Sequence, residues 1–215
     1  MCSTTATAST SSSARSRSDA ILPRSFYARE VVDVARDLLG KVIRHERVAL
    51  RITEVEAYRW PGDTACHARS GRTARNAAIW GPPGHAYVYL CYGLHHMLNV
   101  VTGEEGDAAA VLIRACDPVD GLATIRRRRG GKSGPVLLTG PGKVAAALAL
   151  DTSFSGHPLW RKGGLTIENA PPPAAILVGT RIGIDYALPE HRALPWRFAV
   201  ADSAWVTQRA RLSGA

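Results

Sequence analysis

Two glutamates and one arginine are the side chains of this sequence best suited to acid–base chemistry. Glu54 and Glu56 are two positions apart in a β-like run, so both would point to the same side of a strand. Arg114 lies in another β-like run and points away from its apolar neighbours Val111 and Ile113. A carboxylate held beside a cation can activate a water molecule as a general base. From the spacing alone, a solvated strand face explains these charges more simply.

The elements that would hold these residues are short strands and two helices. Apolar positions recur with helical spacing over 31–39 and end at Gly40, and residues 140–150 begin with glycine and proline, as helices often do. A Gly-, Arg- and Pro-rich connection covers 59–85. β-like runs predict strands at 41–46, 49–57, 86–92, 95–101, 109–115, 164–168, 178–184 and 196–201. Since no repeat occurs, we predict one compact α+β domain over 21–215, with a mixed, largely antiparallel, curved sheet and flanking helices.

Composition places the chain in a broad class. It has 215 residues, 46% of them hydrophobic, which is enough for a buried core. No apolar run approaches the ~20 residues that span a bilayer, so we expect a soluble protein without a membrane partner. The formal net charge is +9, and a positive field attracts polyanions such as DNA. Basic proteins need not bind nucleic acid, so charge alone does not decide.

Residues 1–20 differ in composition from the rest of the chain. They are rich in Ser, Thr and Ala, contain Arg15 and Arg17, and have one acidic residue, Asp19. Nothing in them can join a core, so we predict a disordered tail. They contain no apolar segment of the kind a secretory signal has, whereas organellar transit peptides share their composition. We expect an intracellular protein located with the DNA, in the cytoplasm or nucleoid if bacterial, and leave organellar targeting open.

The cysteines and histidines predict no metal site. The four cysteines are widely separated and include no CxxC pair, which speaks against a disulfide framework. Together with the histidines at 67, 95 and 96 they give spacings that fit no compact zinc finger or ribbon. Cys91 and Cys116 lie in apolar runs, where buried thiols are ordinary. We expect neither a metal nor a cofactor.

A basic segment precedes the second predicted helix. Four consecutive arginines, Arg126 to Arg129, and Lys132 stand before a glycine-rich stretch. They could contact DNA phosphates, but a solvated loop explains them at least as well. The free N–H groups at the start of the 140–150 helix could likewise bind a phosphate or simply begin a helix.

Several uncommon patterns occur in a fixed order along the chain. They are E-x-E-A-Y at 54–58, D-x-x-x-H at 63–67, R-N at 75–76, P-G-x-x-Y-V-Y-x-x-Y-G-x-x-x-x-x-N at 83–99, V-L-x-R-A-x-x-P at 111–118, G-P-x-K at 140–143 and R-F-x-V…W-V over 197–206. With them, the sequence resembles the alkyladenine (3-methyladenine) DNA glycosylase family from about residue 25 to 208. The resemblance implies a monofunctional enzyme that flips alkylated or deaminated purines (3-methyladenine, 7-methylguanine, hypoxanthine) out of duplex DNA. It would hydrolyse their N-glycosidic bonds and so start base-excision repair.

The resemblance also implies catalytic positions. Glu56 matches the general base that deprotonates the attacking water, and Arg114 matches another contact to that water. The main-chain carbonyl of Ile182 completes the contacts of that water, while Glu54 matches a position with no role beyond support. A lyase would need an amine nucleophile. Lys143, the lysine in a matched motif, is better interpreted as structural or phosphate-binding.

A base pocket and a wedge follow from the same resemblance. Tyr58, His67 and Tyr89 match a pocket that holds the flipped purine between flat faces. Asn99 matches the residue that opposes the exocyclic amino group of guanine. Tyr92 matches the wedge that enters the duplex where the base has left. Without the resemblance, the simpler interpretation is that the tyrosines belong to the core, that His67 is hydrogen-bonded within the fold, and that Tyr92 lies in an ordinary hairpin turn.

Two segments depart from the family pattern. His95 and His96 follow the wedge where aromatic or apolar residues are expected, and the connection 101–108 is longer and more acidic than expected. We expect both near the DNA face, where they would affect affinity and sequence context.

Two other functions compete with DNA glycosylase activity. A non-catalytic damaged-DNA-binding protein could share the scaffold, although Glu56 and Arg114 are both present. A hydrolase of free nucleosides would gain nothing from the wedge Tyr92 or from the positive charge. We expect a monomer acting on double-stranded DNA that contains damaged purines.

The departure of the base differs between the two kinds of substrate. A ring-alkylated base leaves readily because it already carries positive charge. Neutral hypoxanthine needs protonation, and the sequence shows no side-chain acid for that step.

Overall fold

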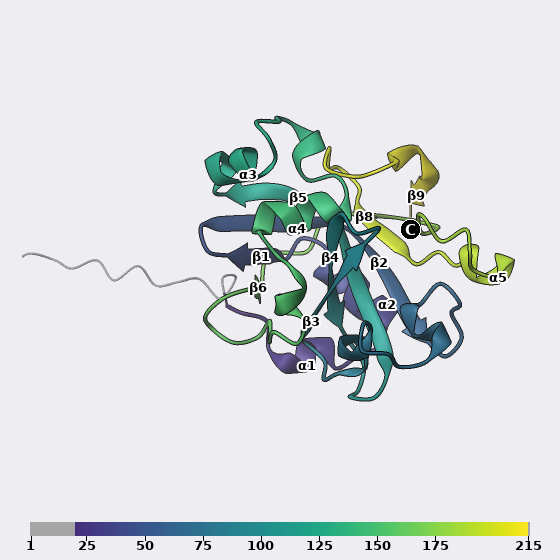
Figure 1. Ribbon diagram of the computed structural model, residues 1–215. Coiled ribbons are helices and arrows are strands. Elements are labelled where there is room, and N and C mark those ends of the chain that lie inside the picture. The colour runs from purple at the N-terminus through teal and green to yellow at the C-terminus, as the bar shows by residue number, and fades with distance from the viewer. Residues whose placement is uncertain (1–19, 215) are drawn as a thin grey trace, which may run out of the picture.

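The computed structural model describes residues 20–214, which form one curved sheet with short helices packed on it (Figure 1). The predicted tail 1–20 lies outside that range apart from Ala20. The strands of the described range are β1 (Val42–His45), β2 (Val48–Trp60), β3 (Ala86–Cys91), β4 (His95–Val101), β5 (Ala108–Asp120), β6 (Thr166–Glu168), β7 (Ile176–Gly179), β8 (Arg197–Val200) and β9 (Leu212–Gly214). Its helices are α1 (Arg24–Tyr27), α2 (Val31–Leu38), α3 (Leu122–Arg128), α4 (Pro141–Leu148) and α5 (Pro189–Arg192), with 3₁₀ turns η2 (His67–Ser70), η3 (Ala77–Trp80), η4 (Pro135–Leu137), η5 (Thr152–Phe154) and η6 (Arg209–Arg211).

The sheet has the order β3-β4-β5-β2-β8-β7-β9, with β1 beside β2 and β6 beside β1. All pairings between these strands are antiparallel, which confirms an α+β fold with a largely antiparallel sheet. The parallel component of a mixed sheet is absent from the described strands. No helix within residues 20–214 has the length and apolar character needed to cross a bilayer.

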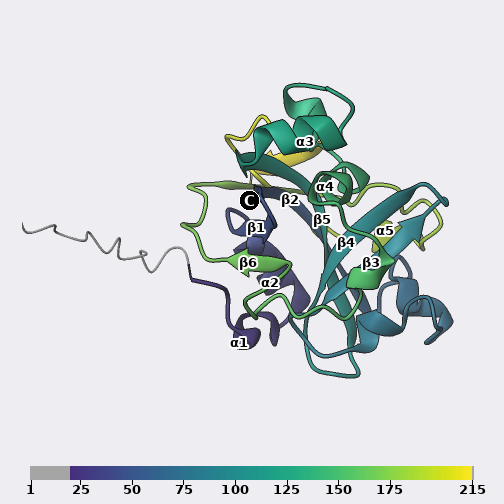
Figure 2. The ribbon, with the colours of Figure 1, turned by 60° about the vertical axis from the view of Figure 1, so that its left-hand side comes forward.

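The two predicted helices form where the spacing placed them. α2 begins where the Glu30 carboxylate accepts the N–H of Val32 at 2.6 Å, and it buries its apolar face. Gly40 then turns the chain away with a φ of +84°. α3 and α4 lie side by side at the top of the molecule in both views (Figures 1 and 2).

The predicted strand 178–184 differs from the structure, and the basic segment 126–132, for which a solvated loop was one explanation, begins within a helix. β7 ends at Gly179, and the apolar Ile182 and Ile184 beyond it line a cavity instead of joining the sheet. Arg126 to Arg128 form the last turn of α3, whose Ile125 is fully buried and anchors that helix. At both positions the isoleucines are buried or partly buried by tertiary contacts, and their spacing in the sequence therefore did not predict the local secondary structure.

An irregularity between β2 and β5 decides which face of the sheet carries the glutamates. Leu50 and Ile52 face the main core, so strict alternation would turn Glu54 and Glu56 to the same side. Ile52 pairs with Cys116 and Glu54 with Ala115, so β2 has one extra residue at this point. Val55 then pairs with Ile113, so β5 has one extra residue, Arg114, directly afterwards. Such a β-bulge re-aims the side chains that follow it. Val55 therefore joins the core, and both glutamates lie on the opposite face.

Candidate active site

A cavity of about 560 Å³ lies on the face of the sheet that carries the glutamates. Its lining includes Tyr58, His67, Tyr89, Asn99, Tyr92, Arg114 and Ile182. All of the predicted pocket, wedge and catalytic residues except Glu56 are therefore brought to its surface. The segments that carry them come from β2, η2, the β3–β4 hairpin, β5 and the loop after β7.

Glu56 lies directly beneath this cavity. Its carboxylate is fully buried, and it accepts hydrogen bonds from the Tyr58 hydroxyl at 2.7 Å, the Ile182 N–H at 2.7 Å and Arg114 Nη1 at 3.2 Å. Each of these three donors lines the cavity. The carboxylate thus has one fixed orientation, with its acceptor oxygens just behind the cavity wall.

Glu54 anchors the arginine beside Glu56. It is fully buried and accepts Arg114 Nε at 3.1 Å and Arg197 Nε at 2.8 Å. The N–H and hydroxyl of Thr207 add two further hydrogen bonds, both of 2.6 Å. Arg114 consequently bridges the two glutamates, so the role of Glu54 is to hold that guanidinium in place.

Aromatic rings form one wall of the cavity. His67 lies edge-on to Tyr89, with ring centroids 4.5 Å apart, and its Nδ1 is 3.1 Å from the Tyr87 hydroxyl. The ring centroids of Tyr87 and Tyr89 are 5.4 Å apart on the same face of β3. The wall offers flat faces and polar edges, as a ring-shaped ligand requires.

Two polar groups of the cavity, Tyr58 and His67, are held in neutral forms. Burial, and then the charge and hydrogen bond of Glu56, raise the pKa of Tyr58 well above its ordinary value. Burial lowers the pKa of His67, and the positive charges of Arg69 and Arg75 lower it further. At neutral pH Tyr58 is therefore a neutral hydrogen-bond donor and His67 an uncharged ring.

Tyr92 stands at the tip of the β3–β4 hairpin. Its side chain is 91% exposed, and both Tyr92 and Gly93 have positive φ, +49° and +68°. The Leu94 N–H donates to the Cys91 carbonyl at 3.0 Å and closes the two-residue turn. A bulky residue rarely adopts a positive φ, and the exposed ring of Tyr92 contributes little to packing. Contact with another molecule would explain a tyrosine at this position.

Asn99 has both a structural and a cavity-lining position. Its Nδ2 donates to the backbone carbonyls of Tyr87 at 3.0 Å and Met97 at 3.3 Å. The neighbouring Leu98 and Val100 belong to the main core, whereas Asn99 lines the cavity. The fixed amide gives this part of the cavity a defined shape.

A family model described as methylpurine-DNA glycosylase matches residues 25–204. This chain belongs to the methylpurine-DNA glycosylase family. A Nitrosococcus oceani protein, provisionally named a 3-methyladenine DNA glycosylase, is 62% identical over 192 residues, which cover 89% of this chain and 96% of that protein. An Arabidopsis thaliana protein named DNA-3-methyladenine glycosylase is 56% identical over 189 residues, covering 87% and 74% of the two chains. The family predicted from the motifs is confirmed, and with it the enzyme class, a DNA N-glycosylase.

Four residues of this glycosylase site received no role from the sequence. Arg197 and Thr207 hold Glu54, while Asp63 and Arg181 form a second buried ion pair behind Tyr58. Asp63 and Arg197 belong to the matched patterns D-x-x-x-H and R-F-x-V, and these patterns could have identified them as site residues. Arg181 and Thr207 had none, because their partners are more than a hundred residues away.

Two cations of the basic segment, Arg129 and Lys132, lie near Lys143, which belongs to the first turn of α4 at the edge of the glycosylase cavity. No acidic residue occurs between Asp120 and Asp151, whereas six basic residues do. Burial and then the charges of Arg129 and Lys132 lower the pKa of Lys143, so these three cations share one surface. Pro141, two residues before Lys143, lines the cavity. This surface suits the phosphates of the DNA on which the family acts.

The two departures from the family pattern have different positions. His95 is exposed beside the wedge, and Gly142 approaches it so closely that a Cβ there would meet the Cβ of His95 at 2.9 Å. The acidic connection 101–108 lies at the other end of β4 from Tyr92. There the Gly103 N–H donates to a carbonyl of Tyr27. Its position near the DNA face stays a prediction.

Groups of three or more His, Cys, Asp or Glu that could hold a metal ion are absent from residues 20–214. The cysteine at 66 is buried beside His67 and its thiol lies 3.8 Å from the Ala108 carbonyl. Burial raises the pKa of this thiol to about 11, as suits a structural residue.

Glu54→Gln should destabilise the protein by about 3–5 kcal/mol, because Arg114 and Arg197 would lose the buried charge that balances them. The exposed pair of Arg29 and Asp37 provides the control, and Asp37→Asn should cost about 0–1 kcal/mol. Urea unfolding monitored by circular dichroism measures both. Equal small effects would show that Glu54 does not anchor the site.

Proposed function

We propose that this glycosylase extrudes a methylated purine from duplex DNA and hydrolyses its N-glycosidic bond with Glu56 as general base. The principal substrate is 3-methyladenine, as in the names of its relatives, and 7-methylguanine and hypoxanthine are further substrates. The observation that carries the proposal is the buried Glu56 carboxylate, fixed by three donors that all line one aromatic cavity.

In the proposed reaction a water molecule attacks the anomeric carbon of the extruded nucleotide. Glu56 accepts its proton while the water oxygen forms the new C–O bond, and the electron pair of the broken C–N bond stays with the base. Arg114, 3.2 Å from Glu56, keeps the carboxylate oriented and is close enough to contact the same water. No amine is poised at Glu56 among the described residues, which agrees with single-step hydrolysis.

The aromatic wall of the cavity favours a base that already carries positive charge. An alkylated purine stacks its electron-poor ring on electron-rich tyrosines, and an uncharged His67 does not repel it. No carboxylic acid belongs to the described cavity lining, so a neutral base has no evident side-chain donor for its departure. We therefore expect hypoxanthine to be released more slowly than 3-methyladenine.

The duplex would lie across the hairpin tip and the basic surface that adjoins the cavity. Arg126 and Arg127 are exposed, as is Lys132. Phosphate contacts from such residues hold the duplex without reading its sequence. The tyrosine at the hairpin tip would fill the gap left by the extruded base. We expect the protein to act as a monomer where the DNA is located.

Two experiments separate this function from its rivals. Cleavage of duplexes with 3-methyladenine or hypoxanthine, resolved on a gel after alkaline treatment, tests excision directly. A non-catalytic damaged-DNA-binding protein would bind both duplexes and leave them uncut. A nucleoside hydrolase would release hypoxanthine from free inosine at least as fast as from the duplex.

Glu56→Gln should abolish excision and leave binding to a damaged duplex nearly intact, because the amide keeps the shape but cannot accept the proton. Loss of a general base costs roughly 10²–10⁴-fold. Single-turnover excision and fluorescence anisotropy on the same duplex measure the two effects. A variant that excises as fast as the wild type would exclude Glu56 as the base.

Tyr92→Ser should weaken binding to a damaged duplex and slow excision, because unstacking a base step costs a few kcal/mol and the extruded state would lose its filler. Thermal stability should not change, as this side chain is exposed. The control is a single-stranded substrate, which has no stack to hold open. Equal losses on both substrates would assign Tyr92 to the fold.

Asn99→Ser should admit guanine, because the shorter side chain removes the group expected to collide with the C2 amino group. Guanine release from undamaged or mismatched duplex would become measurable, while hypoxanthine excision would persist at a lower rate. High-performance liquid chromatography of released bases measures both. If Asn99 only supports the backbones of Tyr87 and Met97, the variant would lose stability and all activities together, with no gain on guanine.

A further inference from the structure

Arg181 and Asp63 form a buried ion pair behind the cavity. Both side chains are 0% exposed, and the guanidinium donates to both carboxylate oxygens, at 2.5 and 2.8 Å. The same guanidinium donates to the carbonyls of Ala57 at 2.8 Å and His191 at 3.0 Å. Burying two charges is costly unless such contacts are nearly complete.

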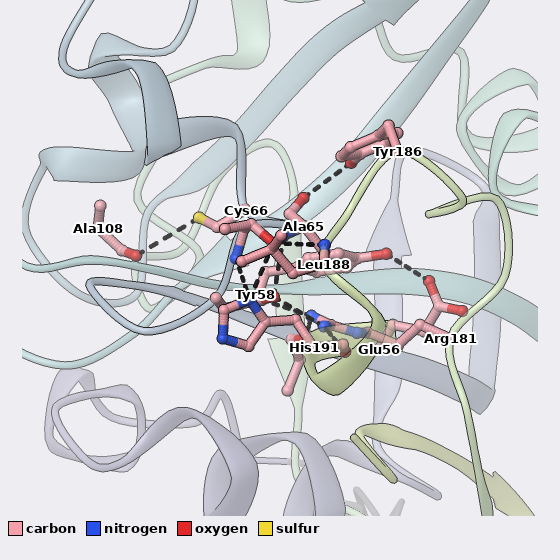
Figure 3. A network of polar contacts seen from close by, with 12 residues as sticks. Glu56, Tyr58, Ala65, Cys66, Ala108, Arg181, Tyr186, Leu188 and His191 are labelled. Carbon is pink, nitrogen blue, oxygen red and sulfur yellow. Dashed lines mark hydrogen bonds and ion pairs between the residues drawn. The ribbon is translucent and has the colours of Figure 1, made fainter. Parts of the chain in front are cut away.

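The guanidinium of Arg181 also stacks on the ring that binds Glu56. Its Cζ lies 4.7 Å from the centroid of Tyr58 and 5.2 Å from that of Trp196. Tyr58 is the donor to one oxygen of Glu56, and Ile182, which directly follows Arg181, is the donor to the other. Arg181 therefore contacts one of the three donors that hold this carboxylate and directly precedes another. Figure 3 labels Arg181, Tyr58 and Glu56.

The pair also joins two walls of the cavity. Asp63 begins the segment that leads to His67, and Arg181 begins the loop whose Ile182, Ile184 and Tyr186 line the cavity. Figure 3 shows the neighbouring contacts between the segments. The Tyr186 hydroxyl donates to the Ala65 carbonyl at 2.8 Å, and the hydroxyl of Thr64 accepts the Leu188 N–H at 2.9 Å and lies 2.8 Å from His191 Nδ1.

We propose that Arg181 and Asp63 are positioning residues for base excision, which act through Tyr58 and Ile182 to hold Glu56 in one orientation. This inference rests on the proposed role of Glu56 as general base. Arg181 lies behind Tyr58 and away from the cavity surface, so it touches no substrate. Its loss should therefore affect the chemical step and leave DNA binding in place.

The experiment compares Arg181→Lys and Asp63→Asn with a control remote from the cavity. Arg44 on β1 donates to both oxygens of Glu168 at 2.8 and 3.0 Å, so Arg44→Lys breaks a two-bond arginine–carboxylate pair that is partly exposed. The single-turnover rate on a 3-methyladenine duplex should fall about 100-fold in the first two variants, because misplacement by ~1 Å costs that much. Affinity for the duplex should change by less than about threefold, and the control should match the wild type in both measurements.

Amide exchange followed by nuclear magnetic resonance gives a readout independent of activity. The Ile182 N–H is protected by Glu56 in the wild type and should exchange faster in Arg181→Lys but not in Arg44→Lys. If a single variant fails to fold, the neutral double variant Asp63→Asn with Arg181→Gln replaces it, since uncharged side chains are cheaper to bury. That double variant should show the same loss of rate.

The outcomes are distinct. A lower rate at unchanged affinity, with faster Ile182 exchange, supports the proposal. An unchanged rate in the folded variants, or a rate and an affinity that fall together in proportion, overturns it. A wild type that excises no base overturns the proposed function instead, and the exchange of Ile182 then still reports whether Arg181 holds this loop.

Discussion

A compensated array of buried charges is the constraint on which this site depends. Three carboxylates, Glu54, Glu56 and Asp63, and three guanidiniums lie out of solvent within one region of the sheet. Each carboxylate accepts from at least one arginine, namely Arg114, Arg181 or Arg197. Removing any member would leave a buried charge without its partner, which is far more costly than the pair is stabilising. The array therefore fixes the position of each member, and Glu56 is the member directly beneath the cavity.

The fold separates rigid and strained parts of the site. β2 and β5, at the centre of the sheet, carry Glu56 and Arg114, so the groups that need accurate placement lie on the best-supported backbone. The hairpin tip carries an exposed tyrosine in a conformation that costs energy. In the proposed function the exposed Tyr92 would contact DNA, whereas Glu56 needs burial to keep one orientation.

The chemistry of the cavity follows from burial as much as from residue type. Five tyrosines and one histidine reach its surface, and burial keeps Tyr58, Tyr89 and His67 uncharged at neutral pH. Neutral aromatic walls suit a cationic purine that needs no acid to depart. The negative charge that the proposed reaction requires lies behind the cavity wall, on Glu56, where Arg114 balances it.

The sequence alone determined the family and the α+β class, and it predicted seven of the residues that line the cavity. Ordered patterns such as E-x-E-A-Y carry that information, and β3, β4 and α2 begin and end close to where their periodicity placed them. The tertiary structure alone decided that Glu54 and Glu56 face the cavity, because the irregularity beside Arg114 reverses an alternation that otherwise turns them to the core. It also brought Asp63 to Arg181 across 118 positions. Such pairings form only when the whole sheet has folded, so the spacing of residues along the sequence cannot predict them.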